Sequence, residues 1–259
     1  MALSPLLSSY DHVLLDLDGC VWVQDAPTPH AREALSELRG AGKSLAFVTN
    51  DSRRSPEEYV RKLWSLGLQA SLEEVVTVGA AIQFLLAERV SGAPTFVIGS
   101  PAVFRHVADS GQRIVNGTPR AAEAELVVVA GHDDFDFDEL RIATQAVLAG
   151  AEMVAADRDR TFPAADGLRP GTGAILAALE YATGATARTV GQPEPLIFQT
   201  AIDRLGPDHR FTTRHRHIGL GDHCSGERRG LRDDDAGRGQ NHRADDNCPE
   251  MLRHSFSPS

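Results

Sequence analysis

The chain has 259 residues, of which 42% are hydrophobic, and its 26 basic and 36 acidic side chains give a formal net charge of −10. This length can hold two modest domains, or one core with an inserted domain. The negative charge argues against nucleic acid or an anionic membrane as a partner, because both attract basic surfaces.

Features of targeting sequences and membrane spans are missing. Residues 1–10 lack the basic and apolar regions of a secretion signal, and no apolar run approaches the about 20 residues that a transmembrane helix needs. The three cysteines do not form a disulfide framework. We therefore expect a cytoplasmic protein that does not bind a membrane.

The first predicted strand is an apolar run that begins at His12 and ends in two carboxylates, Asp16 and Asp18, followed by Gly19. Residues i and i+2 of a strand point to the same side, so these carboxylates would converge at the carboxyl edge of a sheet. Such a pair suits Mg²⁺, or a division of labour in which one carboxylate attacks and the other moves a proton. The alternative is a strand that runs into an ordinary acidic turn.

A second strand, Leu45–Ser52, also ends in small polar residues, and a predicted helix, Ala31–Arg39, separates the two strands. This spacing is typical of a β-α-β unit, which places both strand ends on one edge of a parallel sheet. Thr49 and Asn50 would then supply neutral donors beside the carboxylates, as a phosphate oxygen requires. A further helix is predicted over Pro56–Leu66.

Residues 79–187 read as a second α/β unit, either a plain structural domain or a lid that excludes water and selects the substrate. In the loop after the predicted strand Met153–Ala155, three residues are candidates for substrate contact, with a solvated loop as the alternative: Asp157, Arg158 and Arg160. Its predicted strands are Thr95–Ile98, Leu126–Val129 and Met153–Ala155, and its predicted helices are Ala80–Glu88, Ala102–Ser110, Phe137–Ala149 and Gly173–Thr183.

An ordered series of motifs resembles the NagD-like (4-nitrophenylphosphatase-like) phosphatases of the haloacid dehalogenase superfamily. The similarity runs from about Tyr10 to Leu205, and its motifs are Asp16–Gly19, Phe47–Asn50, Glu125–Gly131, Ala149–Ala151 and Asp159–Gly173. The resemblance implies an α/β fold with a Rossmann-like parallel-sheet core and an inserted α/β cap domain. The core would comprise residues 1–78 and 187–259, atypical from about 207, and the cap residues 79–186.

The resemblance also implies a role for each matching residue. Asp16 would be the nucleophile that forms an aspartyl-phosphate, and Asp18 would protonate the leaving alkoxide and then activate water. Thr49 would hydrogen-bond the phosphoryl group, and Asn50 would orient the site beside it. Mg²⁺ would be held by Asp16, by the backbone carbonyl of Asp18 and by a late acidic residue, for which Asp222 is the candidate.

Gln192 stands where the family has a lysine that neutralises the nucleophile and the phosphate. Gln192 can still donate a hydrogen bond to phosphate, but it carries no charge. Opposite charges about 4 Å apart are worth about 4 kcal/mol at intermediate dielectric. Lys43 and Lys62, the two lysines of the chain, are not obvious substitutes. We expect strongly reduced turnover, with phosphate binding partly kept.

The composition changes abruptly after Gly206, because residues 207–259 contain no Val, Tyr, Trp or Lys. Residues 218–222 resemble the strand end that the family needs, and Glu227 falls near a second acidic family position. We hypothesise a frameshift near Cys224, which an intact reading frame at the locus would refute. A rival hypothesis is a metal site in this tail, although no pair has zinc-finger spacing. Its ligands would be drawn from His215, His217, His223, Cys224, His242, Cys248 and His254.

The sequence thus predicts a Mg²⁺-dependent phosphatase that acts on a small phosphorylated metabolite through an aspartyl-phosphate on Asp16. The alternative is a catalytically impaired or truncated derivative that at most binds phosphate. Sugar phosphates, glycerol phosphate and phosphoglycolate remain open as substrates, and so does a homodimer formed through the cap.

Overall fold

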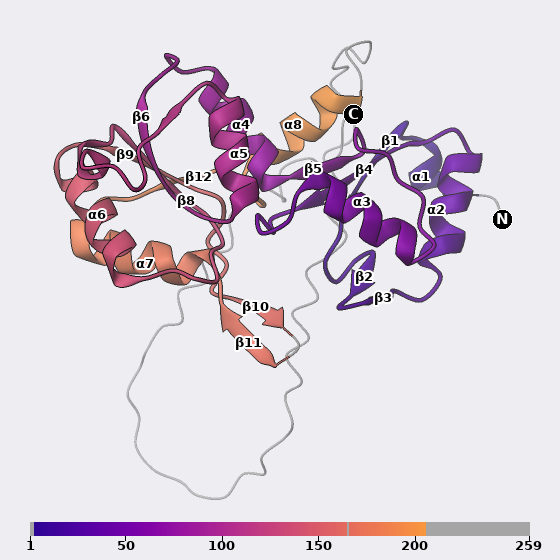
Figure 1. Ribbon diagram of the computed structural model, residues 1–259. Coiled ribbons are helices and arrows are strands. Elements are labelled where there is room, and N and C mark those ends of the chain that lie inside the picture. Colours follow the sequence, from indigo (N-terminus) through magenta and orange to yellow (C-terminus); the bar gives the residue numbers. More distant parts are fainter. Residues whose placement is uncertain (1–2, 165, 206–259) are drawn as a thin grey trace, which may run out of the picture. The chain divides into compact units, whose positions relative to one another are not determined.

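The computed structural model describes residues 3–164 and 166–205, which form an α/β fold with two separate parallel sheets (Figure 1). The first sheet has three strands in the order β1-β4-β5, all parallel. The prediction of an α/β fold built on parallel strands is confirmed. The strands are β1 (His12–Asp16), β4 (Ser44–Thr49) and β5 (Val75–Thr77), and the connecting helices are α2 (Ala31–Gly40) and α3 (Pro56–Ser65).

Local signals fix where α3 begins. Ser55 is its N-cap: the Ser55 hydroxyl accepts from the Glu58 amide, the Glu58 carboxylate accepts from the Ser55 amide, and Pro56 follows in the first turn. A helix α1 (Pro5–Ser8) precedes β1, and a short hairpin of β2 (Trp22–Val23) and β3 (Ala26–Pro27) follows it.

The second sheet has five parallel strands in the order β12-β9-β8-β6-β7. Its strand β12 lies just beyond residue 186, where the expected cap ends, and that domain boundary stays a prediction. The strands are β6 (Pro94–Ile98), β7 (Arg113–Ile114), β8 (Leu126–Val129), β9 (Glu152–Ala155) and β12 (Arg188–Thr189). The associated elements are helices α4 (Val78–Ala87), α5 (Pro101–Asp109), η1 (Ala121–Glu123), α6 (Phe137–Leu148) and α7 (Thr172–Thr183), and a hairpin of β10 (Thr161–Ala164) and β11 (Gly167–Pro170).

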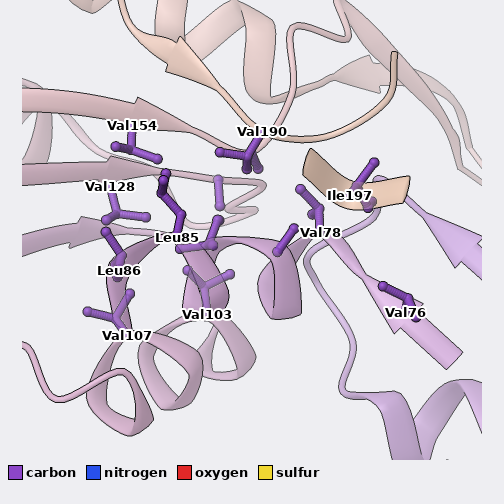
Figure 2. Packing of buried hydrophobic residues seen from close by; sticks show 14 of the residues in the cluster. Val76, Val78, Leu85, Leu86, Val103, Val107, Val128, Val154, Val190 and Ile197 are labelled. Carbon is purple, nitrogen blue, oxygen red and sulfur yellow. The ribbon is translucent and has the colours of Figure 1, made fainter. Parts of the chain in front are cut away.

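One buried hydrophobic cluster contains side chains of both sheets, and Figure 2 shows part of it. Val48 and Val76 enter it from the three-stranded sheet, and Val128 and Val154 from the five-stranded sheet. Helix α8 (Pro195–Leu205) adds Ile197, which is fully buried. Burial of apolar surface at about 25 cal/mol per Å² makes this shared cluster a main source of stability.

Polar contacts also join the loop after β4 to the five-stranded unit. The buried Ser52 accepts a hydrogen bond from the Gly131 amide at 2.9 Å through its hydroxyl, and its carbonyl accepts from the Ser100 hydroxyl at 2.7 Å. The next residue, Arg53, donates to Asp133 at 3.0 Å. The segment that follows Thr49 is therefore anchored on both sheets.

Within residues 3–164 and 166–205, we find no helix long and apolar enough to cross a membrane.

Candidate active site

Two polar strand ends meet at the carboxyl edge of the three-stranded sheet. Strands β1 and β4 pair in parallel with Asp16 opposite Val48, and the Leu17 amide donates to the Val48 carbonyl at 3.2 Å. Asp16 is the last residue of β1 and Thr49 the last residue of β4. The structure thus brings the carboxylate motif and the Thr49–Asn50 motif to one edge.

Asp16 is a half-buried carboxylate that contacts Gln192. The Gln192 side-chain amide donates to Asp16 Oδ1 at 3.3 Å. Burial raises the pKa of Asp16 to about 6, the Gln192 hydrogen bond opposes this rise, and the neighbouring charge of Asp18 adds to it. Because Gln192 carries no charge, its hydrogen bond only partly offsets the cost of holding Asp16 ionised.

Asp18 lies in a tight turn that folds the chain back on itself. Gly19 has φ of +84°, a conformation that favours glycine, and its amide donates to the Trp22 carbonyl at 2.7 Å. The turn places the indole of Trp22 against Asp18, and Trp22 Nε1 donates to Asp18 Oδ1 at 2.7 Å. Asp18 itself is exposed and so remains accessible to a ligand.

The two donors expected beside the carboxylates differ in their surroundings. The buried Thr49 accepts from the Asp51 amide at 3.1 Å through its hydroxyl oxygen, which uses a lone pair and not the hydroxyl hydrogen. Asn50 bonds the backbone of Gln192 twice: its Nδ2 donates to the Gln192 carbonyl at 3.0 Å, and its Oδ1 accepts from the Gln192 amide at 2.7 Å. These two hydrogen bonds hold the backbone of Gln192, whose side chain contacts Asp16.

Gly191 is a close-approach position that the sequence analysis did not single out. Its amide donates to the Ala156 carbonyl at 2.7 Å. A Cβ at this position would lie 2.5 Å from the Ala156 carbonyl oxygen and 2.6 Å from Asn50 Oδ1. Only glycine therefore fits here without a shift of the loop that carries Gln192.

The loop after β9 contains the three candidates for substrate contact, for which a solvated loop was the alternative, and two of them make contacts within the protein. Asp157 is buried, accepting from the Thr172 hydroxyl and the Asp159 amide at 2.9 Å each. Arg158 donates to Glu180 at 2.8 and 3.1 Å. Arg160 is exposed, as is Asp159, whose charge contributes to raising the pKa of Asp16.

Both lysines of the chain are engaged with backbone carbonyls, as expected of residues that do not replace the family's lysine. Lys43 donates to the Tyr10 carbonyl, and Lys62 donates to the Gln24 carbonyl. Cys20 is half-buried and packs against the core, and burial raises the pKa of its thiol, which agrees with a packing residue.

Of the three expected metal ligands, Asp16 and Asp18 lie within the described residues. In the part of the chain that the structure describes, no three His, Cys, Asp or Glu side chains form a group that could hold a metal ion. The expected ligand Asp222, the neighbouring candidate Glu227 and the histidines and cysteines of the rival tail site lie outside the described residues. Asp16 and Asp18 nevertheless form a like-charged pair that a hard cation would neutralise.

Comparison with known proteins shows that this chain is similar to hydrolases. The family model described as haloacid dehalogenase-like hydrolase matches residues 13–113. An acid sugar phosphatase of Staphylococcus aureus is 30% identical over 202 residues, which are 78% of this chain and 76% of that protein.

Two further matches concern Mycobacterium tuberculosis. Its D-glycerol 3-phosphate phosphatase is 36% identical over 203 residues, which are 77% of this chain and 55% of that protein. A crystal structure of the glycerol phosphate phosphatase from this organism, in complex with magnesium, superposes with a TM-score of 0.71 at 34% identity, covering 78% of this chain and 60% of that one. The chain thus spans little more than half of this mycobacterial relative.

Proposed function

The chain belongs to the haloacid dehalogenase-like hydrolases, and on this premise we propose that it is a phosphatase of small phosphomonoesters that uses Mg²⁺. The observation that carries the proposal is the carboxylate pair Asp16 and Asp18 at the end of β1. Gln192 donates a hydrogen bond to Asp16, and Thr49 ends the adjacent strand. The similarity to an acid sugar phosphatase and to a D-glycerol 3-phosphate phosphatase supports it.

Asp16 and Asp18 divide the chemistry between them. A carboxylate oxygen of Asp16 attacks phosphorus, a bond forms between them, and the bond from phosphorus to the substrate's alcohol oxygen breaks. Asp18 gives its proton to that oxygen, so the alcohol leaves neutral. Asp18 then takes a proton from water as the water oxygen attacks phosphorus, which frees Asp16 and releases inorganic phosphate.

The charge balance of the site fits a divalent cation. A phosphate dianion and two carboxylates repel one another, and burial together with the charge of Asp18 already raises the pKa of Asp16. Asp16 and the backbone carbonyl of Asp18 are oxygen donors of the kind that Mg²⁺ prefers, and the family resemblance adds Asp222. When bound, Mg²⁺ offsets the negative charge between nucleophile and phosphate.

Neutral donors complete the phosphate site in this proposal. The Thr49 hydroxyl hydrogen and the Gln192 amide hydrogens can bond phosphoryl oxygens, and Asn50 holds Gln192 in place through its backbone. Each such bond strengthens as charge develops on the transferring group. Because Gln192 replaces a cation, we expect this site to bind phosphate less tightly than one with lysine.

We assign the role of cap to residues 79–186, which contain most of the five-stranded unit. The loop after β9 is fastened within this unit, because the Gly171 and Gly173 amides donate hydrogen bonds to the Arg160 and Asp159 carbonyls at 2.9 Å each. Arg158 is occupied by its ion pair, which leaves Asp159 and Arg160 to face a substrate. Arg160 can donate hydrogen bonds to substrate hydroxyls and Asp159 can accept them, which suits a polyol phosphate such as a sugar phosphate or glycerol phosphate.

Location and assembly follow as further parts of the proposal. The net charge of −10 and the few cysteines support a cytoplasmic enzyme that does not bind nucleic acid. A homodimer formed through the cap is the last part of the proposal. Light scattering after size-exclusion chromatography tests this, since a monomer mass would refute the dimer.

The decisive experiment is an assay of the purified full chain with p-nitrophenyl phosphate, with Mg²⁺ and after its removal by chelation. We expect Mg²⁺-dependent release of phosphate that Asp16→Asn abolishes. Asp11→Asn, which changes an exposed carboxylate just before β1, is the matched control and should keep activity. Mass spectrometry of the quenched enzyme should find phosphate on Asp16; phosphate on another residue, or turnover that survives Asp16→Asn, would refute the proposal.

A further inference from the structure

Trp22 is the partner of Asp18, and the mechanism described above gives it no role. Its side chain is completely buried, and its indole Nε1 donates to Asp18 Oδ1 at 2.7 Å, at the short end of the range for a nitrogen donor. The backbone enforces this contact, because hydrogen bonds close the turn from Leu17 to Trp22. The Val21 and Trp22 amides donate to the Leu17 carbonyl at 3.0 and 3.2 Å.

Helix α3 fixes the plane of the indole. The ring of Tyr59 stacks on Trp22 with centroids 6.2 Å apart and planes 5° from parallel. The ammonium group of Lys62 lies 4.5 Å from the Trp22 ring centre, a cation–π contact. Stacking on Tyr59 and the contact with the Lys62 ammonium group therefore hold the indole N–H in one direction.

The same aromatic pair reaches the other half of the site. Tyr59 is 1% exposed, and its hydroxyl donates to Asp51 Oδ2 at 2.6 Å. Asp51 follows Asn50 and bonds Thr49 through its amide. Stacked together, Tyr59 and Trp22 brace the turn after β1 and the loop after β4 against one another.

An indole N–H is well suited to orient an acid–base group. It is a donor only, so it cannot accept the proton that Asp18 must transfer, and it carries no charge of its own. By occupying Oδ1, it leaves Oδ2 as the oxygen that exchanges protons. An exposed carboxylate without such a bond would rotate about its side-chain torsions and lose part of the advantage of fixed orientation.

We propose that Trp22 is a positioning residue for general acid catalysis, whose indole N–H holds the exposed Asp18 carboxylate in the orientation that protonates the leaving alcohol. This inference rests on the proposed phosphatase function. It predicts an effect that depends on the leaving group: a phenolate such as p-nitrophenolate leaves without help, whereas an alkoxide must be protonated as it leaves.

The kinetic test compares p-nitrophenyl phosphate with glycerol 3-phosphate in Trp22→Phe, which keeps an aromatic ring and removes the N–H. We expect kcat for glycerol 3-phosphate to fall about 10- to 100-fold, part of the 10²–10⁴ that general acid–base catalysis supplies. For p-nitrophenyl phosphate kcat should fall less than about threefold, with KM for both substrates unchanged. Trp64→Phe, which changes a 65% exposed indole that donates to the Ala70 carbonyl, is the matched control and should affect neither substrate. An equal loss on both substrates would overturn the proposal, because a merely structural role does not distinguish leaving groups.

A second measurement needs neither turnover nor a stable Trp22 variant. The chain has two tryptophans, so ¹⁵N-labelled protein gives two indole N–H signals, which Trp64→Phe assigns. We expect Asp18→Ala to move the Trp22 indole proton upfield, as the bond to a carboxylate is lost, and to leave the Trp64 signal in place. An unmoved Trp22 signal would overturn the proposal. If the unmodified chain hydrolysed neither substrate, the proposed function would fail, and the indole signal would still decide whether Trp22 holds Asp18.

Discussion

Replacing Asp157 by asparagine should raise the free energy of unfolding at pH 8 and leave it unchanged near pH 4. Asp157 is only 4% exposed, and both of its carboxylate oxygens accept hydrogen bonds, one from the Asp159 amide and one from the Thr172 hydroxyl. Asparagine keeps the shape and one acceptor, and the Thr172 hydroxyl can turn to accept from the new amide. The substitution therefore removes a charge while keeping one hydrogen bond to each of the two partners.

The magnitude follows from the pKa of Asp157, which burial raises from 3.8 to about 6. Since each pKa unit corresponds to about 1.4 kcal/mol, the ionised carboxylate costs the folded state about 3 kcal/mol. Below pH 3.8 the group is neutral in both states and costs nothing. As pH rises through about 6, the folded state also loses the proton and the penalty becomes complete. The asparagine side chain does not titrate, so the advantage of the variant should grow between about pH 4 and 6 and then stay constant.

Urea unfolding at several pH values between about 4 and 8 measures this difference, with an unchanged m-value as evidence that only stability has changed. Asp109→Asn, at the exposed end of α5, is the matched control and should shift stability by less than about 0.5 kcal/mol at every pH. A difference between Asp157→Asn and the parent that does not vary with pH would refute the reasoning, and so would a loss of stability at pH 8.

Three further substitutions test other parts of the structure. Gly191→Ala places a Cβ 2.5 and 2.6 Å from two oxygens and should cost about 1–3 kcal/mol in urea unfolding, whereas Gly40→Ala, with no atom within 4 Å, should cost nothing; equal effects would contradict this. Gln192→Lys puts a cation beside Asp16, so the pKa of Asp16 should fall from about 6 and turnover of p-nitrophenyl phosphate should rise about tenfold or more; slower turnover would count against the proposed site. Ser55→Ala breaks the capping box of α3 and should lower the free energy of unfolding by about 1 kcal/mol, and an unchanged unfolding midpoint would exclude that contribution.

Elements with a strong apolar pattern could be predicted from the sequence. The strand Leu126–Val129 is observed with the predicted bounds, and the predicted helix Phe137–Ala149 is observed as Phe137–Leu148. The predicted helix Ala80–Glu88 begins earlier, at Val78. Thr77 is the last residue of the preceding strand and also the N-cap of the helix, and its hydroxyl accepts from the Ala80 amide at 3.4 Å. A three-residue buried strand that runs directly into a helix gives no turn signal to mark the change.

The hairpin β10–β11 and helix α8 were not among the predicted elements. Both strands of the hairpin are largely exposed, so no alternation of apolar and polar residues marks them. Helix α8 lies in residues 187–259, which the sequence analysis places in the core without naming a helix. Its buried side chains, such as Ile197, join a cluster made by residues far away in the sequence, and a local pattern does not reveal such packing.

The carboxylate pair of the site was readable from the sequence because Asp16 and Asp18 lie two residues apart at one strand end. The contacts that orient the pair were not readable. Gln192 reaches Asp16 across 176 residues, and Trp22 reaches Asp18 through a turn whose shape depends on the φ of Gly19. The sequence signal that could have predicted the contact between Trp22 and Asp18 is the position of this tryptophan, four residues after the second carboxylate of the pair.

The double engagement of Ser52 limits how the molecule can move. Its hydroxyl and its carbonyl both accept hydrogen bonds from the five-stranded unit, from Gly131 and Ser100 respectively. Ser52 lies three residues after Thr49, the last residue of β4. Moving one sheet away from the other would break these buried hydrogen bonds and, at the same time, separate the hydrophobic cluster that both sheets share. Separation of the two sheets therefore carries the combined free-energy cost of the polar contacts and of the apolar ones.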